Sequence, residues 1–360
     1  MPDDSRPPSA PHLPVRVVVI GDIFDDVIVT PSGPVRTDTD TLAAIERRPG
    51  GSAANTAAWL GSLGTQVDFV GRTNLVDTAR HETALRNSGV TPHLLGESIL
   101  PTGTIVVIVE RAVGANGEAT IDTRTMLTER GANALTSPDD VTDSLLRVAT
   151  HLHFTGYTIF SGQPRDGFVR LIERARMHDV TVSIDPASAG FIADHGASVF
   201  LDTVSGVDIL FPNFDEAVAL TGLTLAPGAA PAESPAATAL QLVNALTEHF
   251  PVVALTLGRA GAVVAAGAPG SPNPIRHVVE CVPVEPRDTT GAGDAFNAGF
   301  LSGLFEGTHA GDHALSPGDG LSARLLRAAT QGVEAAARAI ENVGARPVGV
   351  KTHHHGLNTP

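Results

Sequence analysis

Residues 288–296, Asp-Thr-Thr-Gly-Ala-Gly-Asp-Ala-Phe, place two carboxylates around a glycine-rich turn, and an apolar helical pattern follows directly. The turn Gly291-Ala292-Gly293 has no bulky side chain, so its backbone N–H groups can approach an anion closely. The helix start adds partial positive charge, which stabilises both a phosphate and the carboxylate of Asp294. A carboxylate beside a phosphoryl group can accept a hydroxyl proton, so the stretch indicates phosphoryl transfer. A helix cap is the alternative role that this pattern alone leaves open for Asp294.

The same nonapeptide resembles the C-terminal signature of the ribokinase-like (PfkB) family of carbohydrate and nucleoside kinases, and the family's other motifs occur in the expected order. The resemblance spans roughly residues 15–345. It implies that Asp294 is the base that activates the substrate hydroxyl, and that the amides of Gly291, Ala292 and Gly293 form the anion hole for the transferred phosphoryl group. It also implies ATP as the phosphoryl donor.

Composition restricts the class of protein. With 360 residues, of which 42% are hydrophobic, the chain is long enough for one large α/β domain with an insertion. The formal charge of −15, from 39 acidic and 24 basic residues, disfavours nucleic acid and anionic membranes as partners. No long apolar run and no signal-peptide pattern occur, so we expect a cytoplasmic protein. Lys351 is the only lysine, which excludes a phosphate loop of the GxxxxGK[ST] type.

Strand-like and helix-like segments alternate along most of the chain, which is typical of a doubly wound, mostly parallel α/β sheet flanked by helices. The predicted strands are residues 15–20, 66–71, 151–155, 180–185, 207–211, 252–257 and 277–284, and the predicted helices are 53–63, 166–178, 236–249 and 321–340. The only cysteine, Cys281, is expected to pack within the last of these strands.

Two segments, residues 27–48 and 103–126, depart from this alternation and contain strand-like patterns of their own. The resemblance implies that they form one small β lid over the substrate, whereas two separate surface hairpins are the alternative. We expect a kinase domain over residues 14–350 and disordered tails at 1–13 and 351–360. Exposed lid edges suggest a homodimer paired through the small sheets, although charge can also protect such edges.

Acidic residues follow the first predicted strand, and ligands of open α/β sheets bind outside the carboxyl ends of the strands. The resemblance implies that Asp26 accepts hydrogen bonds from substrate hydroxyls. Asp22 and Asp25 are expected to be solvated turn residues. Phe24 stands where some family members have asparagine, so packing replaces a polar contact there.

Residues 50–55, Gly-Gly-Ser-Ala-Ala-Asn, resemble the family's first signature, G-G-x-x-x-N. The resemblance implies that Gly50 and Gly51 let the substrate approach the backbone and that Asn55 contacts a sugar diol; a helix cap is the alternative for Asn55. The acidic lid residues 37–40 favour a neutral substrate over a sugar phosphate. Because Arg124 and Arg130 could bind a carboxylate, an acidic sugar remains an alternative substrate. Tyr157 is expected to be a partly buried structural residue.

The nucleotide end contains two further motifs. Residues 213–216, Asn-Phe-Asp-Glu, resemble the N-x-x-E motif, which implies that Asn213 and Glu216 organise Mg²⁺ and its waters around the nucleotide phosphates. Residues 256–261 resemble the T-x-G-x-x-G loop for phosphate and adenosine. The residues implied by this second motif are Thr256, Gly258 and Gly261, with Arg259 as a candidate source of positive charge.

Asp288 begins the main signature, where the family resemblance implies a monovalent cation site and therefore activation by K⁺. Hydrogen bonding of its carboxylate to the N–H groups of the turn is the alternative. The sequence thus predicts an ATP-dependent phosphotransferase acting on a hydroxyl of a neutral sugar, ribose- or hexose-like. The alternatives are a nucleoside kinase for adenosine or pseudouridine, a kinase for acid sugars such as 2-keto-3-deoxygluconate, and a catalytically silent sugar-binding protein.

Overall fold

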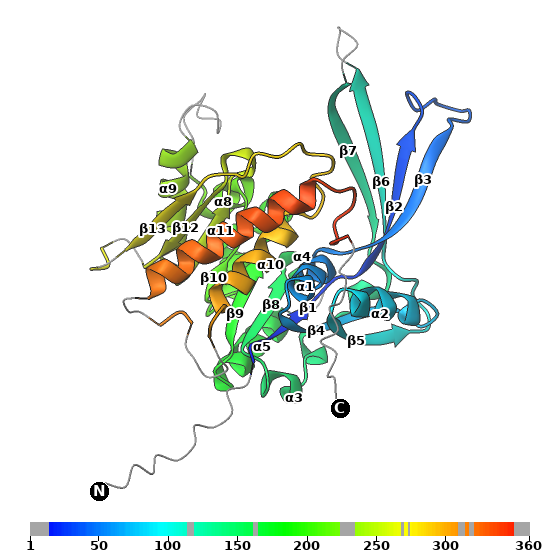
Figure 1. Ribbon diagram of the computed structural model, residues 1–360. Helices are drawn as coiled ribbons and strands as arrows, with labels where there is room; N and C mark the ends of the chain where they lie inside the picture. Colours follow the sequence, from blue (N-terminus) through cyan, green and yellow to red (C-terminus); the bar gives the residue numbers. More distant parts are fainter. Residues whose placement is uncertain are drawn as a thin grey trace, which may run out of the picture.

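The computed structural model describes residues 14–113, 119–160, 165–223, 235–267, 270–272, 274–308, 314–316 and 320–348. Both expected tails, and most of the connection before residue 237, lie outside these residues. The described strands form two sheets, and helices cover the larger sheet (Figure 1).

The larger sheet has the strand order β13-β12-β11-β10-β9-β8-β1-β4-β5. The strands from β11 to β5 are parallel to one another, and β12 is antiparallel to both of its neighbours, β11 and β13. The bounds are β1 (Arg16–Ile20), β4 (Gln66–Asn74), β5 (Val90–Glu97), β8 (His151–Thr155), β9 (Thr181–Asp185), β10 (Ile209–Leu210), β11 (Val252–Thr256), β12 (Ala262–Ala266) and β13 (Ile275–Val279).

Helices pack on both faces of this sheet because its central strands are apolar on both sides. Val17 and Val19 of β1 belong to one core cluster, and Val18 and Ile20 belong to the other. The first face carries α1 (Ser52–Ser62), α2 (Thr78–Asn87), α10 (Ala292–Phe305) and α11 (Leu321–Ile340). The second carries α3 (Asp143–Leu146), α4 (Gly156–Ile159), α5 (Arg165–Met177), α6 (Ala189–His195), α7 (Ala197–Thr203), α8 (Phe214–Thr221) and α9 (Pro235–Leu246). The predicted doubly wound α/β fold is therefore confirmed.

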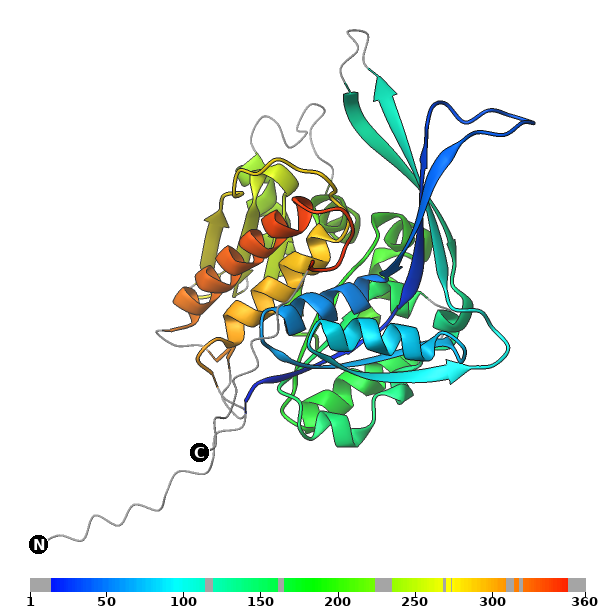
Figure 2. The same ribbon diagram turned by 45° about the vertical axis from the view of Figure 1, so that its right-hand side comes forward.

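The smaller sheet consists of β2 (Phe24–Pro31), β3 (Ala43–Gly50), β6 (Thr104–Val113) and β7 (Ala119–Glu129), in the order β3-β2-β6-β7. Its outer pairs are antiparallel, and β2 pairs with β6 in parallel. The two segments that depart from the α/β alternation thus join one sheet instead of forming separate hairpins. Figures 1 and 2 show this sheet projecting away from the helices of the main body.

One predicted strand is wrong in its second half. β13 ends at Val279, which pairs with Ala262, the first residue of β12, so no partner strand remains for the residues that follow. Cys281 is therefore half-buried outside the sheet. Among the residues that the structure describes, no helix has the length and apolar character needed to cross a bilayer.

Candidate active site

A cavity of about 340 Å³ lies where the carboxyl ends of the central strands face the smaller sheet. Parallel strands bring these ends to one edge, which explains why motifs distant in sequence converge there. The cavity is lined by the following residues singled out in the sequence: Asp26, Gly51, Asn55, Asn213, Glu216, Thr256, Gly291, Ala292, Gly293 and Asp294. Gly50, Gly258, Gly261 and Asp288 are described but do not line it.

Asp294 lies in the first turn of α10 and is 9% exposed. Ser52 Oγ donates a hydrogen bond to its Oδ1 at 2.7 Å, and Asn55 Nδ2 donates to its Oδ2 at 3.0 Å. Burial raises the pKa of Asp294 to about 7, against the lowering effect of these two hydrogen bonds and with further raising by Asp185 and Asp22. Neither Asp294 nor Asn55 serves as a helix cap, since Gly291 and Gly51 occupy the cap positions. A buried carboxylate with a pKa near neutrality is suited to accept a proton.

The turn before α10 requires glycine at its first position. Gly291 has a φ of +76°, and a Cβ there would lie 2.7 Å from the Cα of Ala345. Gly293 faces open space, because no atom lies within 4 Å of the position of its absent Cβ. The first turn of a helix also leaves N–H groups without intrahelical partners. This end of α10 can therefore hold an anion beside Asp294.

Asp26 is half-buried, and one of its carboxylate oxygens accepts no hydrogen bond from a described residue. Its Oδ1 is buried and has no hydrogen-bond partner among the described residues. Burial raises the pKa of Asp26 to about 6, although the positive charge of Arg346 opposes this. Gly50 lies directly behind it, since an added Cβ would be 2.2 Å from Asp26 Oδ2. Gly50 thus leaves room for the carboxylate of Asp26 and does not itself line the cavity.

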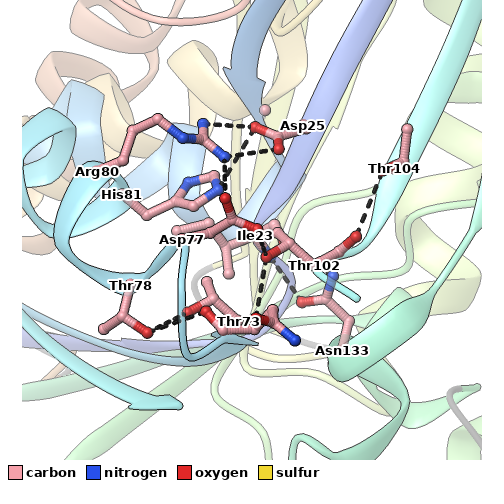
Figure 3. A network of polar contacts seen from close by, with 12 residues as sticks. Ile23, Asp25, Thr73, Asp77, Thr78, Arg80, His81, Thr102, Thr104 and Asn133 are labelled. Carbon is pink, nitrogen blue, oxygen red and sulfur yellow. Dashed lines mark hydrogen bonds and ion pairs between the residues drawn. The ribbon is translucent and has the colours of Figure 1, made fainter. Parts of the chain in front are cut away.

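Asp22 and Asp25 are buried, so the expectation of solvated turn residues is wrong. Asp22 Oδ2 accepts a hydrogen bond from Ser52 N at 2.7 Å, and its Oδ1 accepts one from Thr155 Oγ1 at 3.2 Å. The reason is that β2 begins at Phe24, and Asp25 is already paired in the smaller sheet. Asp25 accepts one hydrogen bond from each terminal nitrogen of Arg80, both at 2.7 Å (Figure 3).

Side chains from the main body hold the smaller sheet at its base, where β2 and β6 begin. Besides the Asp25–Arg80 pair, Asp77 before α2 accepts a hydrogen bond from Thr102 Oγ1 at 2.7 Å. Asn133 bonds both backbone groups of Ile23, accepting from N at 2.9 Å and donating to O at 2.8 Å. Figure 3 shows these contacts as one polar network at the base of both strands.

Asn213 and Glu216 hold each other through hydrogen bonds at the start of α8. Asn213 Oδ1 accepts from Glu216 N at 2.9 Å, while Asn213 N and Nδ2 donate to the Glu216 carboxylate at 2.8 and 2.7 Å. Glu216 is buried, and burial first and Asp185 second raise its pKa to about 8. Burial likewise raises the pKa of Asp185 to about 6, although Asn297 Nδ2 donates to it at 2.7 Å. Clustered buried carboxylates of this kind are stabilised by a cation.

The residues singled out in the 256–261 loop have different surroundings: one lines the cavity, two are exposed and one is buried. Thr256 lines the cavity and bridges to Asn213. Gly258 is exposed at the start of the 3₁₀ turn η3 (Gly258–Ala260), as is Arg259. Gly261 is buried with a φ of +91°, and a Cβ there would lie 2.0 Å from Val279 O. Gly261 therefore allows close packing against the end of β13.

Asp288 lies behind the glycine turn. Its Oδ1 accepts a hydrogen bond from Thr290 N and its Oδ2 accepts one from Gly344 N, both at 2.8 Å. It lines a second cavity of about 140 Å³, which shares Asp26 with the first. In the described part of the chain, no group of three or more His, Cys, Asp or Glu residues is arranged to hold a metal ion.

Several contributors to the site have no role in the sequence motifs. Ser52 lies within the 50–55 motif, where its hydroxyl in the first turn of a helix is the signal that indicates it. No sequence motif indicates Arg346, because its contact with Asn55 joins segments that are far apart in the chain. Arg130 and Tyr157 both line the cavity, and Arg130 Nη2 donates to the backbone oxygen of Tyr157. The side chain of Arg124 lies outside the described residues.

Asp38 and Asp40, the acidic residues within 37–40, are exposed in the connection between β2 and β3, and neither lines the cavity. Their position therefore gives no support to the expected effect on a substrate. The carboxylates that do line the cavity include Asp22, Asp26 and Asp185.

We predict that Asp294→Asn stabilises the folded protein above pH 7. The folded-state pKa of about 7, against the ordinary 3.8, means that the unfolded chain releases this proton more readily, so stability falls as pH rises through this interval. The difference of roughly three pH units corresponds to at most ~4 kcal/mol, because one unit is ~1.4 kcal/mol. Urea unfolding at pH 8 should show the variant ~1–3 kcal/mol more stable, with the gain vanishing towards pH 4. A gain that is equal at both pH values would contradict this origin.

Comparison with known proteins identifies the class of this chain. The family model described as pfkB family carbohydrate kinase matches residues 15–352. Ribokinase of Bacillus subtilis (strain 168) is 26% identical over 300 residues, covering 81% of this chain and 86% of that protein. The crystal structure of adenosine kinase from Sinorhizobium meliloti has a TM-score of 0.72 at 24% identity, covering 94% and 97% of the two chains. A putative ribokinase II from E. coli in complex with ATP and Mg²⁺ has a TM-score of 0.69 at 19% identity, covering 92% and 94%.

Fold and relatives define a carbohydrate or nucleoside kinase, an enzyme that phosphorylates a hydroxyl group. The chain belongs to the pfkB family of carbohydrate kinases. The family resemblance of the sequence motifs is thereby confirmed, and the alternative of a catalytically silent sugar-binding protein receives no support.

Proposed function

We propose that this protein transfers the γ-phosphoryl group of ATP to a hydroxyl of a neutral sugar, ribose- or hexose-like, with Asp294 as the base. The observation that carries the proposal is the position of Asp294. It is buried on the cavity wall, oriented by Ser52 and Asn55, and adjacent to the open turn at Gly293. A hydroxyl and a phosphoryl group can meet there.

In the proposed reaction, Asp26 accepts hydrogen bonds from substrate hydroxyls and Asn55 contacts the sugar from α1. Asp294 removes the proton of the attacking substrate hydroxyl. The hydroxyl oxygen bonds to the γ-phosphorus of ATP while the bond between that phosphorus and the bridging oxygen of the β-phosphate breaks, and ADP leaves. The amides of residues 291–293 stabilise the migrating negative charge. The smaller sheet acts as the lid that keeps water from accepting the phosphoryl group, and we treat residues 14–350 as one kinase domain with this lid inserted.

The residues at the nucleotide end fit a magnesium ion bound with the nucleotide. Mg²⁺ prefers oxygen ligands and keeps several waters, so Glu216 and Asn213 would hold it through water, beside phosphates positioned by Thr256. When bound, Mg²⁺ neutralises charge on the phosphates. Asp288 is the proposed carboxylate ligand of K⁺ in the adjoining cavity, and the proposed roles of Gly258 and Gly261 are to shape the phosphate loop.

The charge of the cavity favours a neutral substrate over a phosphorylated one. Among the described residues that line the cavity, carboxylates outnumber the one cation, Arg130, and like charges near an anionic group weaken its binding. A nucleoside is the second candidate, because Phe24 and the lid residues Ile105, Val107 and Met126 form an apolar wall that suits a base. Paired lids in a homodimer remain part of the proposal, supported by the exposed apolar side chains of Ile45 and Leu127.

Turnover across a substrate panel tests the proposed function. Purified protein with ATP, Mg²⁺ and K⁺ is assayed for ADP release with ribose, fructose, adenosine, pseudouridine and 2-keto-3-deoxygluconate. We expect the highest kcat/KM for ribose or fructose. If adenosine or pseudouridine has the highest kcat/KM, the proposed sugar substrate is wrong and the protein is a nucleoside kinase. If 2-keto-3-deoxygluconate has the highest kcat/KM, the proposed preference for a neutral substrate is wrong.

A further inference from the structure

The segment after α11 returns to the active site and is held there residue by residue. Arg48 Nη1 donates to the carbonyl of residue 343, and the N–H of residue 344 donates to Asp288 Oδ2 at 2.8 Å. The indole N–H of Trp59 donates to the carbonyl of residue 345 at 2.9 Å. These contacts come from β3, the main signature and α1, so they fix the position of the next residue, Arg346.

Arg346 reaches two of the substrate-side groups. Its Nε donates to Asn55 Oδ1 at 3.2 Å, and its Nη2 donates to the backbone oxygen of Gly50 at 3.0 Å. Because the oxygen of the Asn55 amide is occupied, its nitrogen faces Asp294 Oδ2, at 3.0 Å. A guanidinium, an amide and a carboxylate thus form one directed chain of hydrogen bonds.

The positive charge of Arg346 also lies near the carboxylates of the site. The positive charge of Arg346 interacts with Asp294 as well as with Asp25 and Asp26, while burial lowers the pKa of Arg346 to about 10, so it stays charged at neutral pH. The titratable groups around Asp294 and Arg346 are Asp22, Asp25, Asp26, His81, Tyr157 and Asp185, with Glu216 and Arg130 beyond them. The charge of Arg346 thus lowers the pKa of Asp26 and interacts with Asp294.

We propose that Arg346 is a positioning residue for the phosphoryl-transfer step: it orients the Asn55 amide towards Asp294 and holds a positive charge near that base. This inference rests on the proposed role of Asp294. It assigns a function to the C-terminal segment, which carries none of the motifs found in the sequence.

The pH dependence of kcat tests this role. Arg346→Gln should lower kcat at pH 7 by at least ~10-fold and move the acid limb of the profile to higher pH, since loss of a nearby positive charge favours the protonated form of a carboxyl group. The loss should shrink towards pH 9, where Asp294 ionises even without the arginine. The affinity for ATP, measured by titration calorimetry, should stay within a few-fold.

Two further variants separate charge from orientation. Arg346→Lys keeps the charge but cannot reproduce the two-armed contact with Asn55 and Gly50, so its acid limb should stay near that of the wild type while kcat falls several-fold. Arg338→Gln removes an exposed arginine of α11 whose side chain contacts none of the functional residues, and it should behave as the wild type. Melting temperatures of all variants show whether each is folded.

An activity-independent measurement distinguishes this inference from the proposed function. Titration of aspartate-labelled protein by ¹³C NMR, with Asp294→Asn for assignment, should show a higher Asp294 pKa in Arg346→Gln than in the wild type. If the wild type is active but Arg346→Gln keeps its kcat within two-fold and its acid limb in place, the positioning role is wrong and the kinase proposal stands. If no substrate of the panel is phosphorylated, the proposed substrates fail, and the NMR result still decides whether Arg346 controls Asp294.

Discussion

Replacement of Asp294 by asparagine is expected to lower kcat by ~10²- to 10⁴-fold, the usual scale for removing a positioned base. The amide keeps the size of the side chain and can still accept a hydrogen bond from Ser52 or Asn55, so the cavity should keep its shape. It cannot take up the hydroxyl proton at neutral pH. In the proposed reaction the nucleotide lies on the other side of the reaction centre, and its affinity should therefore change by no more than a few-fold.

Steady-state kinetics with the best substrate of the panel, together with calorimetric titration of ATP, measure this effect. Asp166→Asn is the matched control, because Asp166 also lies in the first turn of a helix but is exposed on α5 and paired with Arg170. Normal turnover of Asp294→Asn would reject the assignment of the base. An equal loss in both variants would instead point to a general effect on the fold.

Replacement of Asp26 by asparagine is expected to lower kcat/KM for the sugar by ~10²-fold without changing KM for ATP. The unpaired, buried Oδ1 of Asp26 is the acceptor proposed for a substrate hydroxyl. A hydrogen bond to a charged group contributes roughly 1.5–3 kcal/mol, and a donor placed there by the amide would face the substrate with the wrong polarity.

Steady-state kinetics in which the sugar and ATP are varied in turn give the KM for each substrate and test this prediction. Asp40→Asn, an exposed change in the connection of the same sheet, provides the control. We expect KM for the sugar to rise in Asp26→Asn and to stay constant in the control. A rise confined to KM for ATP, or a change in kcat/KM below three-fold, would contradict the role of Asp26 in sugar binding.

The main elements could be predicted from the sequence because their signals are local. The β-branched run of β1 and the apolar periodicity of α11 reflect burial of one strand and one helix face, and both appear where expected. The acidic residues that follow β1, among them Asp26, could be placed at the carboxyl edge of the sheet because parallel strands share that edge. Asn55 and Asp294 could be assigned only through the motifs that contain them.

The remaining features depend on contacts between distant segments. The burial of Asp25 follows from its pairing across the smaller sheet and from Arg80 of α2, and neither leaves a pattern near residue 25. Arg346 reaches Asn55 only because the chain after α11 is drawn back by α1 and β3. The failure of the expected strand at Cys281 has the same cause, since the length of β13 is set by its partner strand.

The parallel pairing of β2 with β6 also bears on how the chain acquires its structure. Asp25 pairs with Thr104, and β4, α2 and β5 lie between them in the chain. Such a contact closes a long loop and carries an entropic cost that a local hairpin avoids. The smaller sheet should therefore assemble late during refolding, after the intervening segments have docked, and catalytic competence should lag behind the recovery of helical signal.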